Sequence, residues 1–324
     1  MNENRKRRFP LKRLLLVLLV AALVVGALLV AARKAYSLYN SLVRKVNYTN
    51  EVVYAIDEKV QAIRRQLTGE FDHYDFDYSW AAQNPPLIAH ALGGIDGNTY
   101  TNSLEAFEAN YALGQRVFEV DLTFPDTEYT LVAAHTGEDW RRMAGAAPDA
   151  VFSYESFMDS TLCGRYTPLD YRGVIDLMAA HSDIYVVTDT KETDYLSVTL
   201  QFAQLVKYAQ ERDARVLDRL IPQIYHEDML SWVMAVHPFR SVIYTLYQAN
   251  STDQEVLDFC RSSGIRFITA PVSRMRLDTL SLWKNQGIIV ATHTVNAPEK
   301  AQAFLEQGVD VLYTDFLLPE DIDR

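Results

Sequence analysis

The sequence has few residues of the kinds that build sulfur-based sites. Its 324 residues include two cysteines, Cys163 and Cys260, and their spacing is not that of a metal site. Two buried free thiols are a simpler interpretation than a single disulfide, which the count still allows. No H-E-x-x-H motif is present, so a zinc hydrolase site is not indicated. Gly93, Gly94 and Gly97 do not form a dinucleotide-binding fingerprint.

Beyond its N-terminus the chain also lacks positive charge. Residues 1–34 contain eight Lys or Arg and one acidic residue, whereas the remaining 290 residues contain 23 basic and 41 acidic residues. Because nucleic-acid binding needs a basic surface, this acidic part argues against a nucleic-acid partner. It is compatible with a bound divalent cation. Hydrophobic residues make up 49% of the chain, which is enough to bury a substantial core.

One long hydrophobic run lies near the N-terminus. Residues 14–32, LLLVLLVAALVVGALLVAA, contain no charged side chain. At about 1.5 Å per residue, a helix of this length crosses the hydrocarbon core of a bilayer. More Lys and Arg precede the run than follow it. This asymmetry predicts a cytoplasmic segment at 1–13, a single-pass anchor in the cell membrane and an extracytoplasmic remainder. A cleaved signal peptide is the alternative.

A helical stalk is expected after this run, at residues 36–68. Apolar residues recur there at steps of three and four, from Tyr39 to Leu67, with charged residues between them. The pattern is typical of a coiled coil, which would make the protein a homodimer. A single amphipathic helix packed on its own domain fits the pattern equally well. Residues 69–86 break the pattern and end in two prolines, so they are expected to form a linker or an irregular cap.

Residues 87–324 alternate between strand-like and helix-like segments. Such repeated units predict an α/β domain with a TIM (β/α)8-type barrel, and a doubly wound open sheet is the alternative. Nine candidate strands compete for eight places: 87–91, 117–122, 130–134, 184–190, 220–225, 241–247, 265–270, 288–292 and 311–314. The link between the second and third candidates is too short for a crossover helix. The barrel is therefore expected to be irregular near strands 2 and 3, or one candidate is a hairpin arm. Helices are expected at 103–113, 169–181, 196–211, 227–237, 253–262, 277–285 and 298–307.

Residues with reactive side chains lie at the ends of the predicted strands. Glu119 and Asp121 alternate along VFEVDL, so both side chains point to the same face, and Asp189 and Lys191 do so in VVTDTK. The C-terminal strand ends of a TIM barrel hold its active site. Three carboxylates from two strand ends suit a hard cation, Mg²⁺ or Ca²⁺. Lys191 would add positive charge for an anionic substrate.

Two histidines, His90 and His135, also end predicted strands. A histidine can accept or donate a proton near neutral pH, because its ordinary pKa lies there. Each residue taken alone has a structural explanation. Two histidines, three acids and a lysine at neighbouring strand ends together predict a catalytic site.

The order of these motifs resembles the glycerophosphodiester phosphodiesterase family. The matching segments, from about Leu87 to Phe316, are HALGG, TNSLEAF, FEVDL, VAAHT, VVTDTK, HTVN and GVDVLYTDF. The resemblance implies a TIM-barrel phosphoric diester hydrolase that depends on a divalent metal. It implies His90 as the general base and His135 as the general acid. It also places the metal ligands at Glu119, Asp121 and Asp189.

The sequence departs from the family pattern at several positions. Ala91 stands where the family has an arginine that binds phosphate, and Thr101 replaces a glutamate. Asp189 is one methylene shorter than the family's glutamate. His293 stands where the family usually has a tryptophan, and we assign it to substrate binding together with Lys191. These changes affect the substrate pocket more than the two histidines and the metal ligands.

The sequence also predicts roles for three further side chains near these motifs. Asn102, together with a glutamate three residues later, is expected to cap the helix that begins near residue 103. Arg141 or Arg142, which follow the second histidine, could replace the missing phosphate ligand.

The leading function predicted from the sequence is a membrane-anchored, extracytoplasmic phosphodiesterase. Its partners would be glycerophosphodiesters, phospholipid head groups or polymeric glycerol phosphate, and the membrane through the N-terminal helix. A related phospholipase-type lyase that releases a cyclic phosphate is the second possibility. A non-catalytic binding protein on a degenerate barrel is the third.

Overall fold

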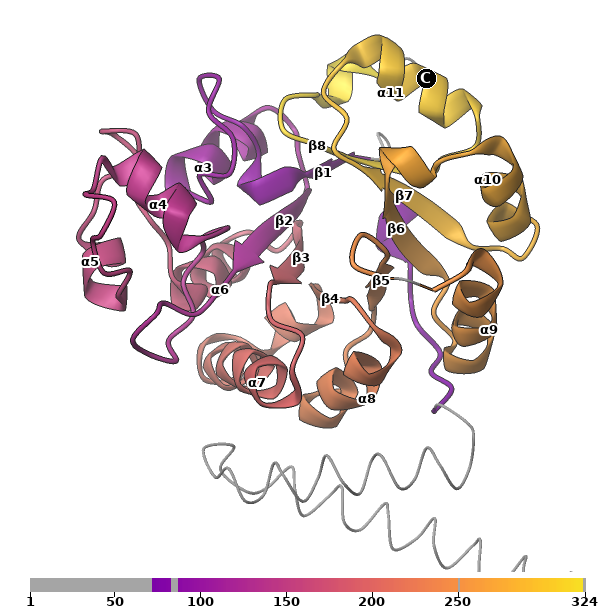
Figure 1. The fold of residues 1–324 in the computed structure, drawn as a ribbon, viewed down its shortest axis with the longest axis horizontal. Coiled ribbons are helices and arrows are strands. Elements are labelled where there is room, and N and C mark those ends of the chain that lie inside the picture. The colour runs from indigo at the N-terminus through magenta and orange to yellow at the C-terminus, as the bar shows by residue number, and fades with distance from the viewer. Residues whose placement is uncertain (1–71, 83–86, 250, 323–324) are drawn as a thin grey trace, which may run out of the picture. The chain divides into compact units, whose positions relative to one another are not determined.

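The computed structural model describes residues 72–82, 87–249 and 251–322. Its centre is a closed barrel of parallel strands in sequential order, surrounded by a ring of helices (Figure 1). The strands are β1 (Leu87–Ala89), β2 (Val117–Leu122), β3 (Tyr185–Thr190), β4 (Leu220–Ile224), β5 (Ile243–Thr245), β6 (Phe267–Pro271), β7 (Ile289–His293) and β8 (Val311–Thr314). The closed sheet confirms the predicted TIM-type barrel and rules out the open sheet.

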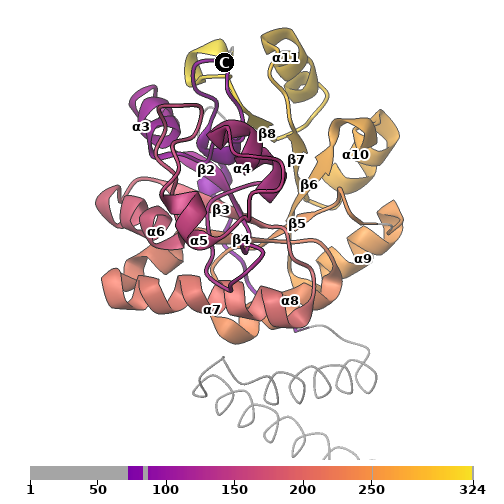
Figure 2. The same ribbon diagram turned by 60° about the vertical axis from the view of Figure 1, so that its left-hand side comes forward.

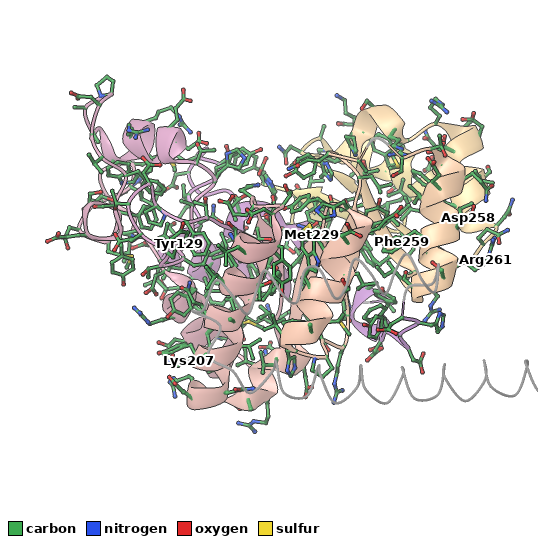
Figure 3. The ribbon with its side chains drawn as sticks, turned by 60° about the horizontal axis from the view of Figure 1, so that its bottom comes forward. Tyr129, Lys207, Met229, Asp258, Phe259 and Arg261 are labelled. Atoms are coloured by element: carbon green, nitrogen blue, oxygen red, sulfur yellow. The ribbon has the colours of Figure 1, made fainter. Side chains whose placement is uncertain are left out.

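The helices bury one face against the barrel. Figure 3 labels Met229 and Phe259, which are buried, and Lys207, Asp258 and Arg261, which are exposed. The α-helices are α3 (Leu104–Ala112), α4 (Gly137–Ala144), α5 (Tyr154–Met158), α6 (Tyr171–Ala180), α7 (Tyr195–Arg212), α8 (Glu227–Val236), α9 (Asp253–Ser263), α10 (Leu277–Lys284) and α11 (Pro298–Glu306). The seven helices expected within residues 87–324 are present, with ends that differ by no more than two residues. Helices α4 and α5 were not expected from the sequence.

The candidate strand at 130–134 does not belong to the barrel, so this prediction was wrong. In the described part of the chain it forms isolated bridges, from Val132 to Thr123 and to Asp170. The segment lies in an insertion between β2 and β3 that also holds α4 and α5 (Figure 2). Val132 and Ala134 are buried in a small apolar cluster that includes Trp140 of α4, whereas Leu131 and Ala133 are buried in the main core. An apolar run of this kind can therefore be buried as a loop as well as a strand. The irregularity expected near strands 2 and 3 lies at this insertion.

Residues 72–82 pack against the end of the barrel at which the strands begin. The indole N–H of Trp80 donates to Ser241 Oγ at 3.1 Å, and the hydroxyl of Tyr78 donates to the carbonyl of Val242 at 2.8 Å. Both acceptors directly precede β5. The opposite end of the barrel, where the strands finish, holds the candidate active site.

Within the described ranges, no helix is long and apolar enough to cross a membrane. The expected cytoplasmic tail at 1–13, the membrane helix at 14–32 and the stalk at 36–68 lie outside these ranges. Both cysteines are free, as expected, but the expected burial holds for one of the two. Cys260 is buried and Cys163 is partly exposed.

Candidate active site

The reactive residues predicted from the sequence meet at the end of the barrel where the strands finish. They surround a cavity of about 260 Å³, which takes its walls from seven of the eight strands or the segments that follow them. The lining residues are His90, Tyr100, Glu119, His135, Asp189, Lys191, Gln223, Thr245, Tyr247, His293, Thr294 and Tyr313. Asp121, the remaining predicted residue, is fully buried behind Lys191.

Glu119, Asp121 and Asp189 form a buried carboxylate cluster. The register of β2 on β3 places Asp121 directly beside Asp189, and Glu119 points to the same face two residues earlier. One oxygen of each residue lies within 4.8 Å of the others. Glu119 Oε1 and Asp189 Oδ1 are buried without a hydrogen-bond partner in the described part of the chain. This donor set of oxygens fits a hard divalent cation, Mg²⁺ or Ca²⁺, which would satisfy those atoms.

Lys191 lies against two members of this cluster. Its Nζ is 2.7 Å from Asp121 Oδ1 and also donates to Asp189 Oδ2. Burial disfavours the ammonium, but the surrounding carboxylates outweigh burial and raise the pKa of Lys191. For the carboxylates burial acts in the other direction and raises the pKa of Glu119 and of Asp189. The pKa of Asp121 is lowered all the same, because Lys191 outweighs the effect of burial. The cluster therefore carries more negative charge than one lysine neutralises, which favours a proton or a cation there.

His90 is held in place by residues that follow β7 and β8. Its Nδ1 lies 2.8 Å from Asp315 Oδ1, and Asn296 Nδ2 donates to the other carboxylate oxygen at 2.7 Å. The backbone N–H of Gly94 donates to the carbonyl of Asp315 at 2.5 Å, and an added Cβ would lie 2.8 Å from that oxygen. Glycine therefore allows the loop after β1 to close on β8. Burial lowers the pKa of His90, but Asp315 and Glu119 outweigh burial and raise it to about 9.

His135 is positioned by the first turn of α4. Its Nδ1 lies 2.7 Å from Asp139 Oδ2, which also accepts a hydrogen bond from the hydroxyl of Thr136 at 2.8 Å. Arg142 donates to the other oxygen of Asp139 at 2.8 Å. Burial raises the pKa of Asp139, but these hydrogen bonds outweigh burial and lower it to about 2. Asp139 is therefore ionised, and its carboxylate accepts a hydrogen bond from Nδ1 of His135.

His293 lies on the wall of the cavity, at the end of β7. Its Nδ1 is 3.1 Å from Thr269 Oγ1, and its ring lies 6.0 Å from the rings of Tyr247 and Tyr313. Burial lowers the pKa of His293 to about 4, and the positive charges of the site act in the same direction. The imidazole is therefore neutral at physiological pH. It presents an uncharged polar edge to the cavity.

Asn102 is a site residue, and the prediction that it caps a helix was wrong. The cap of α3 is Ser103, whose hydroxyl accepts from the backbone of Ala106 at 3.3 Å. Asn102 Nδ2 instead donates to Asp121 Oδ2 at 2.9 Å, and Asn102 Oδ1 accepts from the backbone N–H of Asp121 at 3.0 Å. Its φ of 45° is left-handed, a conformation in which Asn is enriched. Asn102 therefore fixes the orientation of a carboxylate in the cluster.

Three other residues of the site had no role in the sequence analysis. Asp315 lay within a motif of the resemblance, and Asp139 stands at helical spacing from His135, but neither spacing shows a hydrogen bond. The ring of Tyr100 lies between the two histidines, with centroid distances of 4.8 Å to His90 and 4.7 Å to His135. Tyr100 has a φ of 60°, so no regular pattern marks its position.

No arginine replaces the phosphate ligand missing at position 91 in the described structure. The backbone N–H of Ala91 donates to Glu119 Oε2 at 2.7 Å. Arg141 donates to the carbonyl of Ala150 at 2.8 Å, and Arg142 binds Asp139. Neither arginine lines the cavity. Among the described residues that line the cavity, Lys191 is the one lysine or arginine.

Comparison with known proteins identifies structures with a similar fold. No family model and no curated protein sequence matches the chain. Solved structures do match: a glycerophosphodiester phosphodiesterase from Parabacteroides distasonis has a TM-score of 0.58 and 18% identity, covering 73% of this chain and 94% of that one. A phosphodiesterase from Oleispira antarctica, solved with the product sn-glycerol-3-phosphate, has a TM-score of 0.59 and 17% identity, covering 74% and 95%.

A third such structure, a glycerophosphodiester phosphodiesterase from Thermotoga maritima, has a TM-score of 0.54 and 18% identity, and the match covers 72% of this chain and 95% of that one. In all three, the match extends over nearly the whole solved chain. The resemblance noted in the sequence is therefore confirmed at the level of the fold. This chain folds like the glycerophosphodiester phosphodiesterases, at low sequence identity.

Proposed function

We propose that this protein is a phosphodiesterase that depends on a divalent cation and cleaves glycerophosphodiester-type or phospholipid head-group substrates. One observation carries the proposal: two histidines, a lysine and two buried carboxylates line one cavity at the mouth of the barrel, and a third buried carboxylate, Asp121, lies beside them. The Oleispira antarctica relative was solved with sn-glycerol-3-phosphate, which is the product expected of such a reaction. A structural role alone does not account for this concentration of buried charge.

The carboxylate cluster would hold the cation. Glu119, Asp121 and Asp189 would supply the ligands, and Asn102 would keep the Asp121 carboxylate in place. A bound divalent cation would withdraw charge from the phosphoryl oxygens and so make the phosphorus easier to attack. Lys191 would add a second positive charge on the same side of the cavity.

The two histidines would move the protons. Nδ1 of each ring is already hydrogen-bonded to an aspartate, so Nε2 remains for the substrate. A cation held by the carboxylates would lower the pKa of His90 from the value of about 9 that Asp315 and Glu119 give it, which would free Nε2. His90 would then accept the proton of the attacking hydroxyl or water while the new P–O bond forms. His135 would donate a proton to the leaving alcohol as the old P–O bond breaks. The aspartates stabilise the rings in the orientation that this exchange needs.

The attacking group distinguishes hydrolysis from the alternative lyase reaction. Attack by water would give a phosphomonoester, and attack by a neighbouring hydroxyl of the substrate would give a cyclic phosphate. The non-catalytic alternative is favoured by Ala91, because this residue leaves the cavity without the family's arginine. For the N-terminal part we propose a single-pass anchor at 14–32 in the cell membrane, with an extracytoplasmic barrel and a stalk that supports a homodimer.

The test is phosphodiester cleavage by the full-length chain. Glycerophosphocholine is incubated with Mg²⁺, Ca²⁺ or EDTA, and the products are separated to distinguish monoester from cyclic phosphate. We expect turnover with one cation and none with EDTA. His90→Ala and His135→Ala should each lower kcat by about 10²- to 10⁴-fold, the usual contribution of a general acid or base.

His73→Ala is the matched control, because His73 is exposed and hydrogen-bonds to the carbonyl of Ser262, outside the cavity. This variant should retain wild-type turnover. Near wild-type kcat in either active-site variant would remove that histidine from the mechanism. If no cleavage occurs and calorimetry detects no binding of either cation, the chain is a binding protein.

A further inference from the structure

A second hollow, which we call the α11 groove, adjoins the candidate active site. It has a volume of about 860 Å³ and lies between the segment after β6, which includes the 3-10 turn η4 (Val272–Arg274), and helix α11. Its lining residues are Pro271, Val272, Ser273, His293, Thr294, Val295, Asn296, Ala297, Lys300, Ala303, Phe304 and Gln307. His293 and Thr294 line both the groove and the active-site cavity. The two spaces therefore meet at the end of β7.

The chemistry of the groove differs from that of the cavity. About half of its lining residues are apolar, and none of those described is acidic, although acidic residues outnumber basic ones over most of the chain. Lys300 is the one lysine or arginine among them. Val272 is 41% exposed on its wall, so apolar surface faces solvent there. Such exposed apolar surface beside a site is typical of a binding groove.

We propose that the α11 groove binds the acyl or alkyl chain of an amphiphilic phosphodiester whose phosphate lies in the active-site cavity. This inference rests on the proposed function and narrows its substrate class. The cavity alone has about 260 Å³, below the size range usual for a complete ligand site, whereas the groove lies within that range. A chain that leaves the cavity past His293 enters the groove directly.

The lining decides between the substrates that the phosphodiesterase proposal leaves open. Polymeric glycerol phosphate repeats a negative charge along its length and would need a row of cations, but the described lining of the groove offers a single lysine. A glycerophosphodiester with two small alcohols would leave the groove without a ligand. A hydrocarbon chain matches the apolar wall, and the neutral ring of His293 at the junction does not oppose its passage.

The test compares two substrates that differ only in the chain. Glycerophosphocholine and 1-lauroyl-lysophosphatidylcholine, below its micelle concentration, are given to the full-length protein. Because burial of each methylene improves binding about fourfold, kcat/KM for the acylated substrate should be higher by at least about tenfold. Ala303→Trp, on the exposed face of α11, fills the groove and should remove this preference, while kcat/KM for glycerophosphocholine stays unchanged.

Glu306→Trp is the matched control, because it places the same indole on the exposed surface of α11 outside the groove. This variant should keep the chain preference. Equal kcat/KM for the two substrates in the wild-type protein, or a preference that survives Ala303→Trp, would overturn the inference while leaving the phosphodiesterase proposal intact.

Titration calorimetry in EDTA separates the two proposals if neither substrate is cleaved. The lauroyl compound should then still bind the wild-type protein at least about tenfold more tightly than glycerophosphocholine does. Ala303→Trp should abolish that difference and Glu306→Trp should not. Absence of chain-dependent binding would overturn the groove inference on its own evidence.

Discussion

At the scale of single residues, the orientation of His135 depends on one aspartate. Asp139 accepts from Nδ1 of the ring and is itself held by Thr136 and Arg142. Asp139→Asn keeps the shape of the side chain but removes its negative charge. The amide N–H₂ of the new asparagine can also donate a hydrogen bond at the place where the carboxylate accepts one. We expect kcat to fall by about 10- to 100-fold with little change in KM, because a positioning partner affects proton transfer more than binding. Steady-state kinetics with glycerophosphocholine measures both constants.

Glu138→Gln is the matched control for this change. Glu138 is the exposed neighbour of Asp139 in the same turn of α4. It should retain wild-type kcat. An equal loss of kcat in both variants would point to α4 as a whole rather than to the hydrogen bond, and thermal unfolding of the two proteins would show whether the helix had been damaged.

The residues that the sequence could predict are those whose direction follows from strand alternation. Glu119 and Asp121 share a face for this reason, and β2 and β3 bring Asp189 to the same place. Asn102 and Asp315 could not be assigned in this way. The aspartate that binds His90 lies 225 residues further along the chain, and the asparagine lies in a left-handed turn beside a serine that makes a better cap.

At the scale of elements, α4 is the helix that the sequence analysis missed and the site requires. It is eight residues long and mostly polar, so its apolar pattern is short. Its ends carry clear signals: Thr136 caps the first turn, and Gly145 ends the helix in the left-handed conformation with φ 63°. Capping residues would have been a better guide here than hydrophobic periodicity.

The C-cap of α4 gives a prediction for stability. An added Cβ at Gly145 would meet nothing within 4 Å, so Gly145→Ala tests backbone strain alone. We expect the free energy of unfolding to fall by about 1 kcal/mol, because alanine disfavours a left-handed φ. Gly145→Asn should lose less, since asparagine tolerates this conformation. Urea unfolding of the three proteins measures the differences, and equal losses for Ala and Asn would contradict the strain argument.

At the scale of the whole molecule, the barrel determines which strand ends meet. Parallel strands in sequential order bring their C-terminal ends to one mouth, so the alternation of strands and helices was enough to predict a common site. The insertion between β2 and β3 was harder to predict. Some of its apolar residues form a separate small cluster, whereas Leu131 and Ala133 pack in the main core, and a local pattern does not show to which core a buried residue belongs. The active site combines both parts, because His135 comes from the insertion and the other predicted residues from the barrel.

The buried charge at this mouth links cation binding to the stability of the whole barrel. The unfolded chain cannot assemble Glu119, Asp121 and Asp189, so a cation that binds them stabilises the folded state. At about 100 times its dissociation constant, the gain is roughly 2.7 kcal/mol, which for a domain of this size raises Tm by about 5–10 °C. Differential scanning calorimetry with Mg²⁺, Ca²⁺ or EDTA measures the shift. Asp189→Asn should remove most of it, whereas Asp278→Asn, at an exposed aspartate of α10, should retain it. An unchanged Tm in all three conditions would mean that the cluster is neutralised by Lys191 and protons alone.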